Sequence, residues 1–162
     1  MRWDEFGAAC PEIAALARAR LAKDEVIMIG TIRKDGSPRV SPVEPDFAGG
    51  HLLLGMMWRS KKALDLLRDP RCVVHSTPSD RMNLGGDVKL YGTGDDVQEP
   101  GLRQTYRDAI RARIDWAPEE PTYHLFAIDI GAAAYVRFEG AIWESWRWTP
   151  AEGLRKNVRP ND

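Results

Sequence analysis

The sequence lacks the features that secreted, membrane-spanning and disulfide-stapled proteins need. Its 162 residues include two cysteines, Cys10 and Cys72, and neither belongs to a C-x-x-C pair. So few cysteines exclude a disulfide framework and indicate a reducing compartment. The longest apolar runs, 26–30 and 132–136, fall far short of the ~20 residues of a membrane helix. Because the N-terminal MRWDEF also differs from a signal peptide, we expect a cytoplasmic globular protein without a membrane partner.

An excess of charge of one sign is also missing. The 23 basic and 24 acidic residues give a net charge of −1, whereas proteins that bind duplex nucleic acid usually carry a basic excess. We therefore expect no nucleic-acid partner. The three histidines, His51, His75 and His124, stand alone without the spacing of metal ligands. Isolated histidines are usually structural, so we expect no metal site.

Signatures of side-chain catalysis are absent as well. The sequence has no G-x-S-x-G elbow and no Walker loop. Gly92-Thr93-Gly94 lies inside a strand-like run without the third glycine and helix of a dinucleotide fingerprint, and we expect a β-bulge there. Cys72 lies in an apolar strand and is expected to be buried and inert. We predict no catalytic side chain, so any enzymatic chemistry would have to come from a cofactor.

What the sequence does contain is a series of short strand-like segments with three helical ones. The first 25 residues read as one helix that opens at Pro11, and the hairpin turn Asp35-Gly36 is expected to supply positive φ angles. The other helices are expected at 60–68 and 101–114. Strands are expected at 26–32, 38–47, 51–58, 71–76, 87–97, 123–130, 133–138 and 141–148.

These elements predict a single domain over 1–162, of the mainly β (α+β) class. The strands are joined by hairpins and do not alternate one-for-one with helices, so we expect an antiparallel barrel of six to eight strands with helices packed outside. Residues 149–162 are read as a polar C-terminal tail. Residues 77–86 are read as a loop over the cleft.

One stretch suggests a ligand. Ser60 can cap the helix that follows it, yet Lys61 and Lys62 lie in the first helical turn, where the macrodipole favours acids. A bound anion would explain both lysines, and a solvated lysine face would explain them equally well. Arg39, on a neighbouring strand, would either reach that anion or be an ordinary exposed arginine. The tryptophan cluster at 143, 146 and 148 is more typical of core or interface packing than of ligand stacking.

The sequence resembles the pyridoxamine 5′-phosphate oxidase-like split barrels, which bind FMN or the deazaflavin F420. The resemblance rests on a hairpin that reads DGSPRV, on SKKALDLLRDPR opening the next helix, and on the strand motif Leu90-Tyr91-Gly92. It extends over about 16–97 and resumes around 143–155. It implies a homodimeric split barrel with two cofactors between the subunits.

The resemblance also assigns roles to individual residues. The strand that runs along the flavin corresponds to Arg39, Val40 and Ser41. The strand end that lines the flavin ring and ribityl chain corresponds to Met56 and Met57. The phosphate-binding trio corresponds to Ser60, Lys61 and Lys62. Trp146 matches a tryptophan that reaches the cofactor across the dimer interface. Asp87 stands where true oxidases carry a glutamine near the flavin ring.

Two departures argue against the vitamin B6 reaction. Asp87 replaces the expected glutamine, and the tail 153–157 lacks the histidine of the substrate-binding run. We therefore expect an FMN-dependent oxidoreductase that acts on an unidentified small molecule. The alternatives are an F420-dependent reductase, with Arg33, Lys34 and Arg59 near the cofactor's acidic tail; a non-catalytic flavin-binding module; and a dimeric interaction protein that has lost its cofactor.

Overall fold

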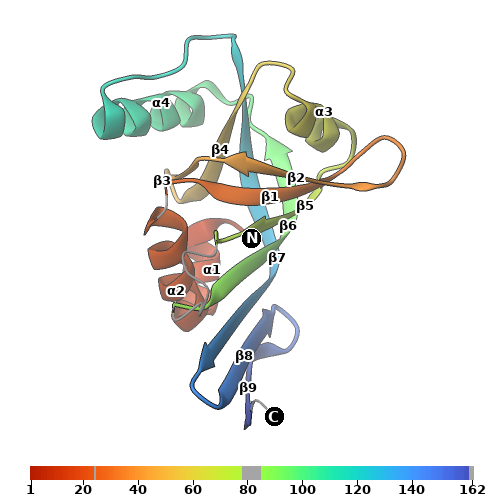
Figure 1. Ribbon diagram of the computed structural model, residues 1–162. Helices are drawn as coiled ribbons and strands as arrows, with labels where there is room; N and C mark the ends of the chain where they lie inside the picture. Colours follow the sequence, from red (N-terminus) through yellow and green to blue (C-terminus); the bar gives the residue numbers. More distant parts are fainter. Residues whose placement is uncertain (24, 78–84, 161–162) are drawn as a thin grey trace.

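The chain folds around one antiparallel sheet that closes into a barrel (Figure 1). The computed structural model describes residues 1–23, 25–77 and 85–160, and within them it has nine strands and four helices. The helices are α1 (Trp3–Ala9), α2 (Pro11–Lys23), α3 (Lys61–Arg68) and α4 (Pro100–Ile114). The strands are β1 (Ile27–Ile32), β2 (Pro38–Val43), β3 (Pro45–Ala48), β4 (His51–Met57), β5 (Arg71–His75), β6 (Asp87–Asp96), β7 (Tyr123–Glu139), β8 (Ile142–Thr149) and β9 (Gly153–Pro160).

The sheet order is β2-β1-β5-β6-β7-β4-β3, with β8 and β9 attached to the far end of β7. Contacts between β2 and β4 bring the two ends of this path together. The antiparallel barrel class is thus confirmed, with nine strands instead of the expected six to eight. The segment 38–47, expected as one strand, divides at Glu44 into β2 and β3, and the segment expected to be a polar tail contains a further strand, β9. Its side chains from 155 to 160 are exposed, so it carries no apolar alternation that could have predicted a strand.

Strand β7 is continuous where the sequence predicted two strands. The register with β6 shifts between Tyr91 and Gly92, and Gly131 is the extra residue on β7. A side chain at Gly92 would be impossible, because its Cβ would lie 1.8 Å from the carbonyl oxygen of Asp129. The expected bulge at Gly92 is therefore confirmed. It bends β7 without ending it, whereas in the sequence Gly131 reads as a strand break.

The N-terminal segment forms two helices instead of the expected one. The break lies at Cys10, whose backbone N–H donates to the carbonyl of Phe6. Pro11 disfavours helical backbone at the residue before it, which explains the break. The two helices cover one side of the barrel, and Phe6, Ile13 and Leu21 are fully buried there (Figure 1).

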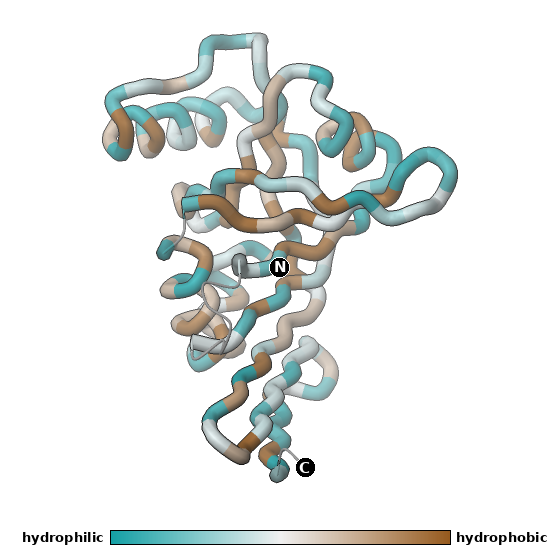
Figure 2. The backbone as a smooth tube through the Cα atoms, viewed as in Figure 1, coloured by the Kyte–Doolittle hydropathy of each residue, from teal (hydrophilic) through white to brown (hydrophobic). Residues whose placement is uncertain are grey.

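The hairpin between β1 and β2 turns at Asp35-Gly36, as expected, but with a different geometry. Only Gly36 has a positive φ, of 83°, because the loop spans three residues between paired Arg33 and Ser37. Asp35 keeps a negative φ and accepts hydrogen bonds from the N–H and hydroxyl of Ser37. This matches a three-residue loop that ends in a left-handed glycine. The tip is hydrophilic (Figure 2).

Two further findings concern membrane-spanning helices and metal ligands. None of the helices in the described part of the chain is both long and apolar enough to span a membrane. Within the same residues, no three His, Cys, Asp or Glu side chains come together as metal ligands would. The expected loop over the cleft falls mainly on 78–84, which lie outside the described residues.

Candidate functional site

The turn between β4 and α3 places the Ser60-Lys61-Lys62 trio. The N–H of Ser60 donates to the carbonyl of Met57 at 3.0 Å, which closes the turn. Arg59 within it has a left-handed φ of 54°, an uncommon conformation for a residue with a side chain. Backbone strain of this kind is often found at ligand sites.

Ser60 occupies the N-cap position of α3 but does not cap it with its side chain. Its hydroxyl is buried and has no hydrogen-bond partner among the described residues. The first N–H groups of a helix have no intrahelical partner either. A buried hydroxyl without a partner costs about 1–3 kcal/mol. An anion held at this helix end would satisfy both kinds of donor, so the residues present fit a phosphate group.

The two lysines differ in their surroundings. Lys61 is exposed, whereas the Lys62 ammonium is partly buried and donates to the carbonyl of Pro42 on β2 at 2.5 Å. Burial lowers the pKa of Lys62 from its usual value. Lys62 thereby joins the start of α3 to the end of β2. This hydrogen bond holds the Lys62 side chain in place.

Arg39 is held by a carboxylate on the same helix. Its Nε donates to Oδ2 of Asp65 at 2.6 Å, and the side chain of Asp65 is 5% exposed. Asp65 also accepts from the Thr31 hydroxyl at 3.0 Å and from Arg68 at 3.3 Å. Burial alone would raise the pKa of Asp65, but these hydrogen bonds outweigh it and hold the pKa below its usual value. Arg39 is thus fixed beside α3 with its Nη groups still available.

The expected flavin-contacting residues lie on both sides of the trio. Val40 and Met57 are 66% and 78% exposed, which is unusual for apolar side chains at strand positions. Ser41 is half-buried on β2, and Met56 is a buried residue of β4. Trp58, also exposed, stacks on His124 with ring centroids 4.5 Å apart. Val40, Met57 and Trp58 thus expose apolar side chains on β2, at the end of β4 and in the turn before α3.

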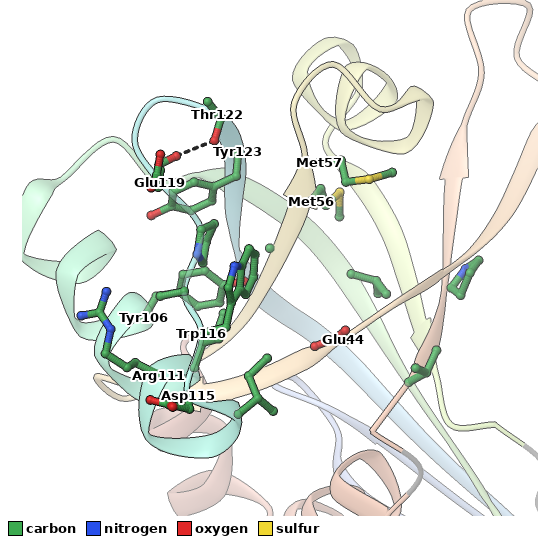
Figure 3. A pocket seen from close by; sticks show the side chains of 18 of the residues that line it. Glu44, Met56, Met57, Tyr106, Arg111, Asp115, Trp116, Glu119, Thr122 and Tyr123 are labelled. Carbon is green, nitrogen blue, oxygen red and sulfur yellow. Dashed lines mark hydrogen bonds between the residues drawn. The ribbon is translucent and has the colours of Figure 1, made fainter.

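A cavity of about 1040 Å³ opens next to this surface. It lies between the end of β4, the bend from β2 to β3 at Glu44, the helix α4 and the segment that follows α4 (Figure 3). Three of the expected residues, Met56, Met57 and Lys62, line it. The cavity extends from Met57 and Lys62 to α4, a helix that was not expected to lie near a ligand.

The sequence analysis missed the residues on the α4 side of the cavity. Tyr106 and Tyr123 are buried and stack with centroids 5.8 Å apart, and Trp116 is exposed at the rim. Tyr106 fits where it does because Gly55 has no side chain: a Cβ there would lie 1.7 Å from the tyrosine hydroxyl. In the sequence, Tyr106 belongs to a four-residue apolar repeat that is typical of a helix packed on a core. The repeat alone does not distinguish a residue that lines a cavity from a residue in the hydrophobic core.

Asp87 and Trp146 lie away from the other expected residues. Met57 pairs with Tyr123 on β7, whereas Trp146 pairs with Tyr135, twelve residues farther along the strand. That separation is about 40 Å in an extended strand. Figure 1 shows β8 and β9 at the opposite end of β7 from α3 and α4. Within one chain, Trp146 does not reach the cavity.

Asp87 and Trp146 each contact side chains from their own part of the sheet. Lys89 lies 3.2 Å from the Asp87 carboxylate, at the start of β6. The Trp146 indole donates to Glu144 at 2.7 Å, and the Lys156 ammonium lies 3.8 Å from its ring centroid. The chain therefore brings Arg39, Lys62 and their neighbours together and leaves Asp87 and Trp146 apart.

Comparison with solved structures finds the same fold at low sequence identity. The heme binding protein of Mycobacterium smegmatis has a TM-score of 0.64 at 18% identity, with 93% of this chain covering 59% of that one. The chain thus spans less than two thirds of that relative. A pyridoxamine 5′-phosphate oxidase-related, FMN binding protein from Nostoc punctiforme gives 0.62 at 13%, with 92% and 95% covered. PhzG from Burkholderia lata, in complex with tetrahydrophenazine-1-carboxylic acid, gives 0.63 at 12%, with 94% and 93% covered.

The sequence itself gives the more specific result. A search of curated proteins found no match. The comparison with protein families matches residues 13–137, which span most of the chain, from α2 to the end of β7. This range contains the β4–α3 turn, the Arg39–Asp65 pair and the cavity. The chain therefore belongs to the pyridoxamine 5′-phosphate oxidase family.

Proposed function

We propose that the protein is an FMN-dependent oxidoreductase that acts on a small molecule not yet identified. The observation that carries this proposal is the buried Ser60 hydroxyl, which has no partner among the described residues and lies at the start of α3 beside Lys62. The family match and the FMN binding of the Nostoc relative support a flavin over other phosphate-bearing ligands. The heme binding protein of Mycobacterium smegmatis makes a heme the competing ligand, and no histidine is found among the described residues that line the cavity.

The chain's own residues would bind and orient the cofactor. Ser60, Lys61 and Lys62 would hold the phosphate, with the Nη groups of Arg39 beside them. Val40, Ser41, Met56 and Met57 would lie along the ring and ribityl chain, which would cover the exposed faces of Val40 and Met57. FMN, when bound, supplies hydride transfer, which explains how a site without a predicted catalytic side chain could act.

We further propose that the site is completed by a second copy of the chain. Trp146 on β8 and Asp87 on β6 pair with Tyr135 and Val136 near the far end of β7, too far from Lys62 to contact a ligand there in the same chain. The exposed apolar side chains of Val40, Met57 and Trp58 are suited to a surface that a partner covers. In a homodimer, Trp146 of one chain could contact the cofactor held by the other.

F420 is the second candidate cofactor, and one observation favours it. Arg59 is exposed beside Ser60, where it could meet an acidic tail that extends from the phosphate. Arg33 and Lys34, the other candidate cations, lie in the β1–β2 hairpin loop. FMN would leave all three cations solvated.

The test is a titration of the purified protein with FMN, riboflavin and F420, followed by absorbance. Riboflavin has the same ring as FMN and no phosphate. The double variant K61A/K62A should weaken FMN binding roughly tenfold to hundredfold per lost contact, while leaving riboflavin binding unchanged. K34A removes a comparable charge from the hairpin and serves as the control for FMN.

Three results would contradict the proposal in different ways. Unchanged FMN binding by K61A/K62A would remove the phosphate-site assignment. Tight binding of F420 alone, weakened by R59A, would replace the cofactor. Binding of neither cofactor would leave the dimeric interaction protein that has lost its cofactor.

A further inference from the structure

The cavity has two walls that differ in composition. Its volume of about 1040 Å³ lies at the upper end of the range of about 300–1,000 Å³ that is typical of small-molecule pockets. Lys62 lines the cavity on one side. Tyr106 and Trp116 lie on the wall formed by α4 and the segment after it, with Tyr123 at the start of β7 beside them (Figure 3). The phosphate-binding turn accounts for the first wall. The second wall has no role in the function proposed above.

Tyr106 offers an unused hydrogen-bond donor on that second wall. The residue is 5% exposed, lines the cavity, and its hydroxyl has no hydrogen-bond partner among the described residues. The neighbouring Tyr123, by contrast, donates its hydroxyl to Glu120 at 2.8 Å. Burial, with the nearby carboxylates of Asp46 and Glu44, raises the pKa of Tyr106, so its hydroxyl stays protonated. The hydroxyl oxygen keeps some solvent exposure at the cavity, so a bound molecule could accept a hydrogen bond from it.

The position of this hydroxyl relates it to the expected flavin contacts. It lies against Gly55, where a Cβ would be 1.7 Å from it. Gly55 and Met57 point to the same face of β4 and are about 6.6–7 Å apart. A molecule bound to Tyr106 would therefore lie next to a ring that packs on Met57. That is the neighbourhood in which a reaction partner of the flavin would have to sit.

The charges on the α4 side do not suit an anion. The side chains of Asp115 and Glu119 have no ion-pair partner among the described residues, and Glu44 is paired with Arg113 at 3.2 Å. Among the described residues that line this side, Arg111 is the one cation, and it lies 4.0 Å from Asp108 on its own helix. A phosphate or carboxylate placed here would find carboxylates without a free counterion.

We propose that the α4 side of the cavity binds a second, planar small molecule that is neutral or cationic and accepts a hydrogen bond from the Tyr106 hydroxyl. This inference deepens the proposed function, because the molecule would be the substrate class of the flavin site. Tyr106 acts here as a specificity residue: it selects a ring with an oxygen or nitrogen acceptor. The stacked Tyr123 and the exposed Trp116 supply flat walls for that ring.

The test uses coumarin, a neutral planar ring with a carbonyl acceptor, and coumarin-3-carboxylate, the same ring with a negative charge. Binding is measured by equilibrium dialysis to the FMN-free and the FMN-loaded protein. We expect coumarin to bind in both states, and the carboxylate to bind several-fold more weakly. Y106F should weaken coumarin binding about tenfold, because one hydrogen bond is lost. Y123F removes a hydroxyl from the same wall that is already paired, and should leave coumarin binding unchanged.

The outcomes separate this inference from the FMN proposal. Equal coumarin binding by Y106F and the wild type would overturn the role of Tyr106, and tighter binding of the carboxylate would overturn the charge class. Displacement of FMN by coumarin would show one site instead of two. Failure to bind FMN would contradict the proposed function alone, since coumarin binding to the FMN-free protein still tests Tyr106. Absence of coumarin binding in both states, with FMN bound normally, would overturn this inference alone.

Discussion

Arg39 and Asp65 form the link between the strand expected to run along the flavin and the helix expected to hold its phosphate. Arg39 Nε lies 2.6 Å from Asp65 Oδ2, and Thr31 and Arg68 supply two further donors to the same carboxylate. The acid is buried and the arginine is 24% exposed, so the carboxylate depends on its partners more than the cation does. The pair fixes α3 against the β1–β2 hairpin.

The variant D65N tests the structural weight of this pair. It removes the charge, retains the shape, and leaves Arg39 without a buried counterion, which should lower the free energy of unfolding by about 2–4 kcal/mol at pH 7. R68A, which removes a partner that is 37% exposed, should cost less than about 1 kcal/mol. Urea unfolding measures both values. If both variants lost the same free energy of unfolding, the buried Asp65 would contribute no more to stability than the exposed Arg68.

The same variant gives a pH dependence with a defined sign. The folded pKa of Asp65 is depressed, so its contribution to stability is fully present above the unfolded value of about 3.9 and is lost as the pH falls toward the folded pKa. The difference in unfolding free energy between the wild type and D65N should therefore be constant near neutral pH and narrow below about pH 4. A difference that grows on acidification would contradict this assignment.

The variant S60A distinguishes a structural role of the Ser60 hydroxyl from a role in ligand binding. The hydroxyl is buried without a partner, so S60A should leave the free energy of unfolding unchanged or raise it slightly. The same variant should weaken FMN relative to riboflavin, because only FMN carries the phosphate. Thermal unfolding and the two titrations measure these effects. A loss of stability without a change in the FMN-to-riboflavin ratio would show that Ser60 serves the helix and not a ligand.

The parts of this fold that the sequence predicted were those with a local cause. Runs of β-branched residues bounded by turn residues predicted most strands, and lysines in the first turn of α3 pointed to an anion site. The parts that failed depend on distant residues or on exposed ones. Gly131 reads as a break until its partner strand supplies the bulge, and the polar β9 has no pattern of its own.

The site shows the same division. Ser60 and Lys62 lie close together in the sequence and could be grouped from it. Asp65 is 26 residues from Arg39, and Tyr106 is farther still from the Gly55 that it packs against. Only the barrel brings such residues together, so the carboxylate that holds Arg39 and the tyrosine wall of the cavity could not be predicted.

The thiols offer a test of the expectation that Cys72 is inert. Cys72 is half-buried and not fully buried as expected, and this burial, together with the nearby Asp95, raises the pKa of its thiol to about 12. Burial also raises the pKa of Cys10, which is 1% exposed. Since the thiolate is the reactive form, neither cysteine should react with iodoacetamide in the native protein at pH 8, and both should react in urea. Mass spectrometry of the labelled protein measures this, and rapid native labelling of Cys72 would contradict it.

The last prediction tests whether Trp146 acts on the cofactor of a second chain. W146A and K61A/K62A should each weaken FMN binding when expressed alone. Co-expression with two different tags allows the mixed dimer to be isolated. If Trp146 contacts the cofactor of the partner, one site of the mixed dimer combines intact lysines with an intact tryptophan, and it should bind FMN with wild-type affinity at one per dimer. If Trp146 acts only within its own chain, both sites carry a defect and neither recovers. A mixed dimer of wild-type and doubly altered chains, whose sites each carry one defect in the first case, is the matched control.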